Sequence, residues 1–273
     1  MATSFSVNTN PGAFIALQNL SATNRALDTT QLRITTGLKV NGPKDDASTF
    51  AIAQNMRGDI AGMQSVKTAL AAGESTINVA ITGGKSIADM LLEMKAKVVQ
   101  ANQAGLDSAS RTALHNDFMA LRDQIETIVG SAEFNGKNLI TSGATNLTVL
   151  STVDGSTITV SAQTMDITTL GISASSLSSS SGAALALGAI NTAISLISEK
   201  LAALGSAAKR IEVQADFTVK LVDILKEGVG NLVDANMAEE SASLQALQIK
   251  QQLGVQALSI ANANPQSILQ LFQ

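Results

Sequence analysis

Apolar residues recur at helical spacing in both flanks of the chain. In the N-terminal flank, Leu20, Leu27 and Ile34 lie seven residues apart, as in a coiled coil. The positions interleaved with these three are Leu17, Asn24, Gln31 and Leu38. Near the C-terminus, the same alternation of three and four residues joins Ala246, Ile249, Leu253, Gln256 and Ile260. The pattern predicts that both flanks are helices that pair lengthwise.

Longer helices are predicted inside these flanks. Residues 45–103 read as one helix, with Asp45, Asp46 and Ser48 as candidate caps after Pro43. A second helix is expected at about 108–130, where an apolar row runs along one face. Helix resumes near residue 184, and its apolar positions again alternate by three and four: Leu187, Ile190, Ile194, Ile197, Leu201 and Leu204.

The middle of the chain has a different character. Phe134-Asn135-Gly136 signals a turn, and Thr145–Leu150 and Ser156–Val160 alternate as the strands of a β-hairpin do. Residues 173–182 are rich in serine, which predicts a loop or connector. Surface hydroxyls in such a loop are candidates for O-linked glycosylation, and the candidate positions are Ser175, Ser176, Ser178 and Ser179.

The expected fold is therefore mainly α, a long antiparallel helical rod or coiled coil formed by the N- and C-terminal flanks, with a small β-hairpin insert. We predict that residues 1–43 and 233–273 form a terminal coiled-coil segment. Residues 44–232 would form a helical rod domain, which includes the hairpin and the serine-rich insert at about 134–183.

Charged side chains are absent from both ends of the chain. No ionisable side chain precedes Arg25 and none follows Lys250, although the net charge is only −4. A solvated helix normally carries charges on its outer face, so uncharged ends look like surfaces covered by other protein; frayed tails are the alternative. Neither end has about 18 uninterrupted apolar residues, and the N-terminus lacks the pattern of a cleaved signal, so we expect no membrane insertion.

The composition leaves little room for catalysis. The chain has no cysteine and a single histidine, His115, which excludes a thiolate site and any metal site with two histidines. The pair Gly228 and Gly230 lacks the third glycine of a dinucleotide-binding loop, since Val233 stands in its place. A net negative charge disfavours nucleic acid as a partner. We therefore expect no enzymatic activity, and no catalytic, cofactor-binding or metal-binding residue.

Two long motif sets lie at opposite ends of the chain. Residues 18–63 contain a paired-leucine helix and the turn after it at Leu32–Leu38, the capping segment Asn41–Ser48 with its Lys-Asp-Asp-Ala sequence, and the start of a helix at Ala51–Ala53. Residues 232–272 contain Asp234–Glu239, Gln248–Gly254 and Ala261–Leu271. The first set closely resembles the N-terminal signature of bacterial flagellins, and the second resembles their C-terminus nearly throughout.

The resemblance implies a structural subunit that polymerises into the flagellar filament for swimming motility. Its termini would be disordered before assembly and would then line the inner wall of the filament, and the short middle suggests little or no outer variable domain. The implied partners are other copies of the chain, the flagellar export apparatus, a secretion chaperone, and hook-associated and cap proteins. The implied location is the extracellular filament, reached without a cleaved signal peptide. The expected assembly interface consists of Leu17, Leu20, Leu27, Ile34, Ile249, Leu253, Ile260 and Leu269.

Two other functions remain open at this point. A hook–filament junction protein shares a weaker version of these termini but does not propagate a filament. A secreted coiled-coil adhesin or effector would have similar helices without a need for its termini in self-association.

Overall fold

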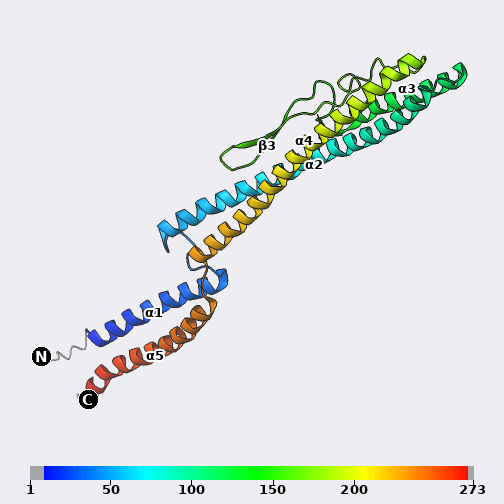
Figure 1. The fold of residues 1–273 in the computed structure, drawn as a ribbon. Helices are drawn as coiled ribbons and strands as arrows, with labels where there is room; N and C mark the ends of the chain where they lie inside the picture. Colours follow the sequence, from blue (N-terminus) through cyan, green and yellow to red (C-terminus); the bar gives the residue numbers. More distant parts are fainter. Residues whose placement is uncertain (1–8, 270–273) are drawn as a thin grey trace. The chain divides into compact units, whose positions relative to one another are not determined.

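The computed structural model describes residues 9–269, with side chains as far as residue 263. The helices are α1 (Pro11–Thr36), α2 (Ala47–Ala101), α3 (Ser108–Ser131), α4 (Ser180–Val233) and α5 (Met237–Leu269). The strands are β1 (Glu133–Phe134), β2 (Lys137–Asn138), β3 (Leu147–Leu150) and β4 (Thr157–Val160). The prediction of a mainly helical chain with a small hairpin insert is confirmed (Figure 1).

The chain forms two compact units. The first contains Met1–Gly58 and Ile224–Gln273, and the second contains Asp59–Asp223. Helices α2 and α4 each contribute residues to both units. The boundaries between the two units therefore lie inside α2 and inside α4. The predicted domain boundaries, at residues 43/44 and 232/233, lie instead close to the loops that precede α2 and follow α4.

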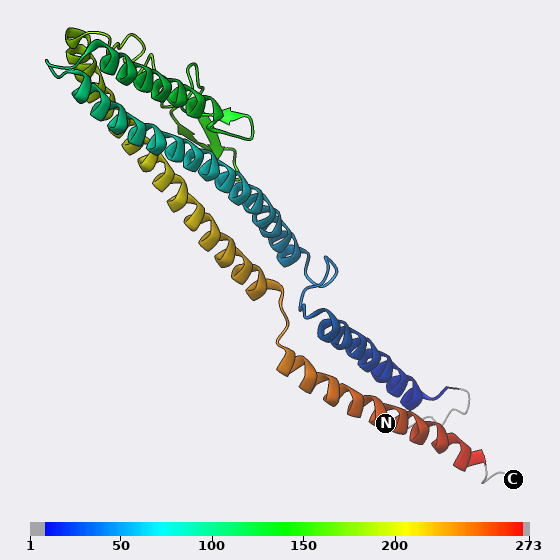
Figure 2. The same cartoon turned by 90° about the vertical axis from the view of Figure 1, so that its right-hand side faces the viewer.

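In the first unit, α1 and α5 lie side by side and antiparallel (Figures 1 and 2). Helix α1 begins where Asn10 accepts a hydrogen bond from the Ala13 N–H and Pro11 occupies the first turn, which needs no backbone donor. It ends at Gly37, whose φ of 73° is readily adopted only by glycine.

Short loops connect α1 to α2 and α4 to α5, and they are hydrogen-bonded to each other. The Lys39 N–H donates to the Val233 carbonyl at 2.7 Å, and the Ala235 N–H donates to the Gly37 carbonyl at 2.8 Å. Val40 and Val233 are buried beside this bridge. The two connections therefore hold each other in place, although they are almost 200 residues apart in sequence.

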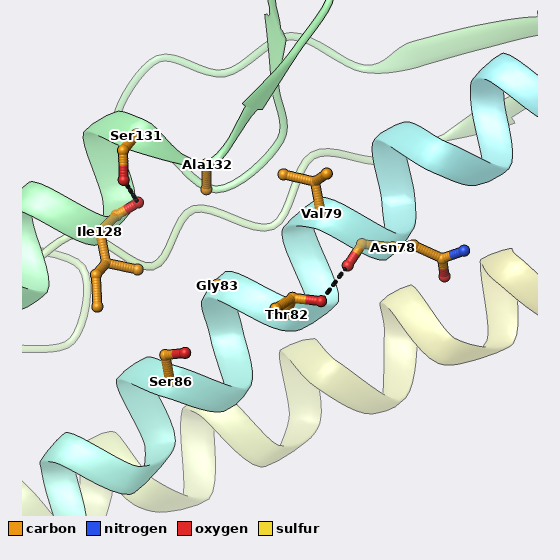
Figure 3. Close-up of a pocket in the computed structure, with 8 residues that line it drawn as sticks. All are labelled: Asn78, Val79, Thr82, Gly83, Ser86, Ile128, Ser131 and Ala132. Atoms are coloured by element: carbon orange, nitrogen blue, oxygen red, sulfur yellow. Dashed lines mark hydrogen bonds between the residues drawn. The ribbon is translucent and has the colours of Figure 1, made fainter.

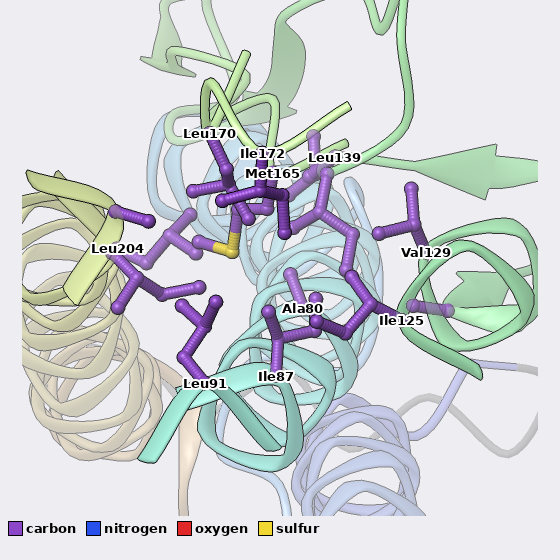
Figure 4. Close-up of a cluster of buried hydrophobic side chains, with 14 of the residues drawn as sticks. Ala80, Ile87, Leu91, Ile125, Val129, Leu139, Met165, Leu170, Ile172 and Leu204 are labelled. Carbon is purple, nitrogen blue, oxygen red and sulfur yellow. The ribbon is translucent and has the colours of Figure 1, made fainter. Parts of the chain in front are cut away.

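The second unit has a single hydrophobic core made by α2, α3, the first part of α4 and the segments between them. Figure 4 shows Ile87 and Leu91 of α2, Ile125 of α3, Leu204 of α4 and Met165 of the connecting segment meeting in this core. The predicted apolar row of α4 faces inward: Ile190, Ile197 and Leu204 are fully buried, and Leu187, Ile194 and Leu201 are half-buried.

Side chains cap the ends of the long helices. The Asp46 carboxylate accepts hydrogen bonds from the N–H groups of Ser48 and Thr49, which confirms the predicted start of α2 to within two residues. The Thr49 hydroxyl also donates to this carboxylate, and it lowers the pKa of Asp46 below its usual value. At the other end of α2, the buried Arg111 guanidinium donates to the carbonyls of Ala101 and Gln103, which no longer have partners within the helix.

The irregular segment between α3 and α4 contains two hairpins. Strands β3 and β4 pair antiparallel, with Leu147 opposite Val160 and Leu150 opposite Thr157, as the alternation predicted. Strands β1 and β2 are joined by Asn135 and Gly136, with φ of 51° and 75°, so the Asn-Gly turn is confirmed as well.

The serine-rich segment forms a loop only as far as Ser179, because α4 begins at Ser180, about one turn before the predicted start. Two hydrogen bonds connect the loop to α3. Arg122 donates to the Ser173 carbonyl at 3.3 Å, and the Leu177 N–H donates to His115 Nδ1 at 3.3 Å. Leu177 itself is buried in the core.

Glycines on one face of α2 allow other elements to approach it closely. Gly62, Gly73 and Gly84 are spaced by eleven residues, which is three helical turns. A Cβ at Gly62 would lie 2.8 Å from the Val153 side chain, and one at Gly73 would lie 2.5 Å from Val149. A Cβ at Gly84 would lie 2.8 Å from Leu201. The β3–β4 hairpin and α4 therefore dock where α2 has no side chain.

The docking contact at Gly73 can be tested by substitution. Gly73→Ala should lower the free energy of unfolding by about 1–3 kcal/mol, because the added methyl group overlaps Val149. Urea denaturation followed by circular dichroism measures the change. Gly130→Ala is the matched control, since nothing lies within 4 Å of that position, and it should be neutral or slightly stabilising. Combining Gly73→Ala with Val149→Ala should recover part of the lost free energy of unfolding. If Gly73→Ala alone has the same free energy of unfolding as the unmodified chain, the docking contact is contradicted.

Candidate assembly interface

The seam between α1 and α5 is formed by residues that lose part of their surface to the opposite helix. On α1, this seam consists of Ala13, Ala16, Leu20, Thr23, Leu27, Thr30 and Ile34. On α5, it consists of Glu240, Leu244, Leu247, Gln251, Gly254, Leu258 and Ala261. Both rows keep the alternation of three and four residues, so the two helices pack as an antiparallel coiled coil.

Three polar contacts define the register of this coiled coil. Asn10 Nδ2 donates to the Ala261 carbonyl at 2.7 Å, and Gln251 Nε2 donates to Asn24 Oδ1 at 2.8 Å. Arg33 and Glu240 form an ion pair at 3.0 Å. Only the pair nearest the connecting loops is charged. The uncharged part of α1 therefore lies beside the uncharged part of α5.

Only some of the predicted apolar positions face the opposite helix. Leu20, Leu27 and Ile34 lie in the seam as predicted. Ile249, Leu253 and Ile260 do not, because 58%, 63% and 59% of their surfaces are exposed, and Leu17 is 52% exposed. The C-terminal apolar row is thus real, but it points away from α1. The side chain of Leu269 lies outside the described residues.

Several residues of the seam could not be found from the apolar periodicity. They are Thr30, Gln251, Gly254 and the Arg33–Glu240 pair. These residues are small or polar, so they do not contribute to a pattern of apolar positions. Gly254 is needed for close approach, since a Cβ there would lie 3.2 Å from Leu20 Cδ1. Leu244, Leu247 and Leu258 were the available signal for this face of α5.

The outward faces of α1 and α5 form an apolar surface without charge. Phe14, Ile15 and Leu17 are exposed on α1 before the first charged residue. On α5, Leu253, Val255 and Ile260 are exposed after the last one, and Ile249 lies just before it. We call this set the outer stripe. Each helix of the pair has one partner in the chain but two apolar faces, so one face remains available to another molecule.

The second unit contains a surface groove whose lining carries no charged side chain. Between α2 and α3 lies an open groove of about 420 Å³, lined by uncharged residues only (Figure 3). Its walls include Val79, Thr82 and Gly83 of α2 and Ile128 and Ser131 of α3. No group of three or more His, Asp or Glu that could hold a metal ion occurs among the described residues.

Helix α4 is long and apolar enough to cross a membrane by length and composition, with a mean hydropathy of 1.5 in its most apolar window. Its inward residues, however, pack in the core of the second unit. Packing in this core buries 28% of the most apolar window of α4.

The four candidate glycosylation positions differ in access. Ser178 and Ser179 are exposed, whereas Ser175 and Ser176 are half-buried. The Ser179 hydroxyl accepts from the Gly182 N–H at 3.0 Å and so helps to begin α4.

A chain whose two terminal helices pair and leave an uncharged apolar surface open belongs to the class of helical proteins that offer such a surface to another molecule. Residues 7–145 match the bacterial flagellin N-terminal helical region, and residues 187–272 match the bacterial flagellin C-terminal helical region. The chain therefore belongs to the bacterial flagellin family, whose members are structural subunits of the extracellular flagellar filament.

Individual relatives agree with this assignment over their whole length. Flagellin FljK of Caulobacter vibrioides is 47% identical over 269 residues, with 98% of both chains covered. A flagellin of Brucella melitensis is 36% identical over 281 residues, with 98% of this chain and 99% of the relative covered. Among solved structures, a putative flagellar hook-associated protein from Vibrio parahaemolyticus covers 70% of this chain and 100% of its own, with 15% identity and a TM-score of 0.58, which shows a similar fold.

The ion pair in the seam gives a test of the observed register. Arg33→Glu places two like charges together and should weaken the assembled polymer by about 1 kcal/mol per subunit, a roughly fivefold rise in critical concentration. The exchanged variant, Arg33→Glu with Glu240→Arg, should lower the critical concentration again, to a value close to that of the unmodified chain. Sedimentation of polymer at graded protein concentrations measures it. An exchange no better than the single variant would contradict the pairing of Arg33 with Glu240.

Proposed function

We propose that this subunit builds the filament through the outer stripe of its terminal coiled coil. Residues 1–43 and 233–273 would form the inner core of the filament, and residues 44–232 the surrounding rod. The observation that carries the proposal is the outer stripe itself, an exposed apolar surface on two helices that bear no charge over the same length. Leu17, Ile249, Leu253, Ile260 and Leu269 would contact neighbouring copies, while Leu20, Leu27 and Ile34 hold the two helices together.

The absence of charge has a physical reason in such an arrangement. A helical polymer repeats each side chain at every subunit, so a charge in the inner core would face copies of itself. Burying an unpaired charge costs far more than burying an apolar side chain gains. Amide and hydroxyl groups such as those of Asn24 and Gln251 can pair within the seam and need no counter-ion.

Folding of the ends is coupled to assembly in this proposal. Helix α1 has 26 residues and its seam contains Ala13, Ala16 and Thr23, so the isolated pair buries little apolar surface. That burial does not offset the conformational entropy lost when both helices form. Neighbouring copies supply the remaining burial by covering the outer stripe, so the ends become ordered as the polymer grows.

We further propose that the chain is exported by the flagellar apparatus in an unfolded state, without removal of a signal peptide. A secretion chaperone would cover the apolar C-terminal segment until export, and cap and hook-associated proteins would contact the growing filament. The absence of cysteine supports this route, since no disulfide can form before the chain is exported. The outer stripe also supports it, because exposed apolar surface needs protection in the cell.

The two other functions have less support. The fold alone is shared with a hook-associated protein at 15% identity, whereas the flagellin FljK matches 98% of this chain at 47% identity. An adhesin or effector would not require uncharged ends on both helices of one coiled coil. The match to both flagellin regions, at opposite ends of the chain, favours the filament subunit.

The exposed serines are the positions where we propose O-linked glycosylation. Ser178 and Ser179 are accessible in the loop before α4, and Ser175 and Ser176 are less so. Peptide mass spectrometry of filaments from the native host should place added sugar on Ser178 or Ser179 first. Unmodified peptides covering residues 173–182 would contradict this assignment.

The outer stripe can be tested at Leu253. Leu253→Asp should prevent polymer growth, because it places a carboxylate between copies where it has neither water nor a counter-ion. Leu253→Asn is the matched control, since it removes the same apolar contact without adding charge, and it should polymerise at a raised critical concentration. Seeded growth followed by electron microscopy separates the outcomes. Filaments of normal length from Leu253→Asp would disprove the role of the outer stripe.

A further inference from the structure

Helix α4 carries a second row of residues on the face opposite its core. Ser206, Arg210, Val213, Phe217 and Lys220 are spaced by four, three, four and three residues, and all are exposed. More than half of the surface of both Val213 and Phe217 is accessible. We call this row the α4 stripe. The spacing is that of a coiled-coil seam, but no helix of the second unit covers it.

Helix α2 carries a comparable row near its C-terminal end. Lys85, Asp89, Leu92, Ala96 and Val99 are spaced by four, three, four and three residues, and all are exposed. At least half of the surface of Leu92 and of Val99 is accessible. We call this row the α2 stripe. Neither stripe contributes to the core of the second unit.

The two stripes lie toward opposite ends of the second unit. Gly84 of α2 packs against Leu201 of α4, and the two helices run antiparallel. The α2 stripe follows Gly84 toward the C-terminal end of α2. The α4 stripe follows Leu201 toward the C-terminal end of α4, which is the opposite direction along the unit. With a rise of 1.5 Å per residue, their centres are roughly 30 Å apart along the helices. One copy cannot bring its own two stripes together.

We propose that the α2 stripe of one copy binds the α4 stripe of the next copy, head to tail, in the assembled filament. The proposal rests on the proposed function, since it requires that copies assemble. An open polymer needs a contact between two different surfaces of the same chain, because a contact of one surface with itself closes a dimer. The two stripes are different, apolar at their centres and located at opposite ends.

The register follows from the two patterns. Because α2 and α4 are antiparallel within a copy, a copy shifted along the same axis presents α4 antiparallel to the α2 of its neighbour. Leu92 then lies opposite Phe217, and Ala96 lies opposite Val213. The same register places Asp89 opposite Lys220, a pair of opposite charges at the edge of the apolar contact.

Engineered cysteines can detect this contact directly, because the chain has no cysteine of its own. In the variant Ala96→Cys with Val213→Cys, mild oxidation of assembled polymer should produce a ladder of covalent dimers, trimers and longer oligomers on a non-reducing gel. Each single variant should remain monomeric on the same gel. Oxidation of dilute, unassembled protein should give no ladder.

The matched control moves one cysteine to an exposed alanine elsewhere in the same unit. Ala113 is exposed on α3, so Ala113→Cys with Val213→Cys has the same chemistry without the proposed contact. This control should give no ladder. Filaments that assemble normally but fail to cross-link through positions 96 and 213, or that cross-link equally through 113 and 213, would overturn the inference. Failure of the unmodified chain to polymerise at all would instead count against the proposed function.

A charge exchange tests the register by a second measurement. Asp89→Lys and Lys220→Asp each place like charges opposite each other, and each should raise the critical concentration for polymerisation by roughly tenfold. The double exchange should restore it to near the starting value. Lys67→Asp, on an exposed part of α2 outside the stripe, should leave it almost unchanged. A double exchange that stays as weak as either single variant would contradict the pairing of Asp89 with Lys220.

Discussion

The antiparallel pairing of α1 with α5 brings the two terminal helices together, and it leaves several large apolar side chains of both helices exposed. Each helix has a seam toward its partner and a second apolar face toward the outside. Because water does not solvate that second face favourably, its burial against another molecule would be favourable. The lack of charge from residue 251 onward, and before Arg25, fits a covering molecule that is another copy of the same chain.

Glycine residues allow close approach between elements in both units. In the second unit, Gly62, Gly73 and Gly84 remove side chains from one face of α2, so the hairpin and α4 fit against the helix backbone. In the coiled coil, Gly254 plays the same part opposite Leu20. The polar seam residues then determine the register, because Asn24 and Gln251 can satisfy each other's hydrogen bonds in one alignment only. Long helices that would otherwise slide past one another are thereby held at one offset.

Much of the fold could be predicted from the sequence, since local signals agreed with the tertiary arrangement. Asp46 begins α2, Asn135-Gly136 makes a tight turn, and the inward row of α4 faces the core as its spacing indicated. The same reasoning could not show that Leu17, Ile249, Leu253 and Ile260 lie outside the seam. A helix with apolar residues on two faces gives the same periodicity whichever face meets the partner, so spacing alone could not assign these positions to the seam or to the outside.

The sequence by itself determined that the chain is helical at both ends, that those ends are uncharged, and that they resemble flagellin termini. These properties depend on residue type and local spacing, which are readable without a structure. Only the tertiary structure decided which face of α5 meets α1, that Arg33 pairs with Glu240, and that α2 and α4 each carry an uncovered stripe. Those features depend on contacts between residues far apart in the chain. In such contacts a small residue such as Gly254 matters as much as a large apolar one.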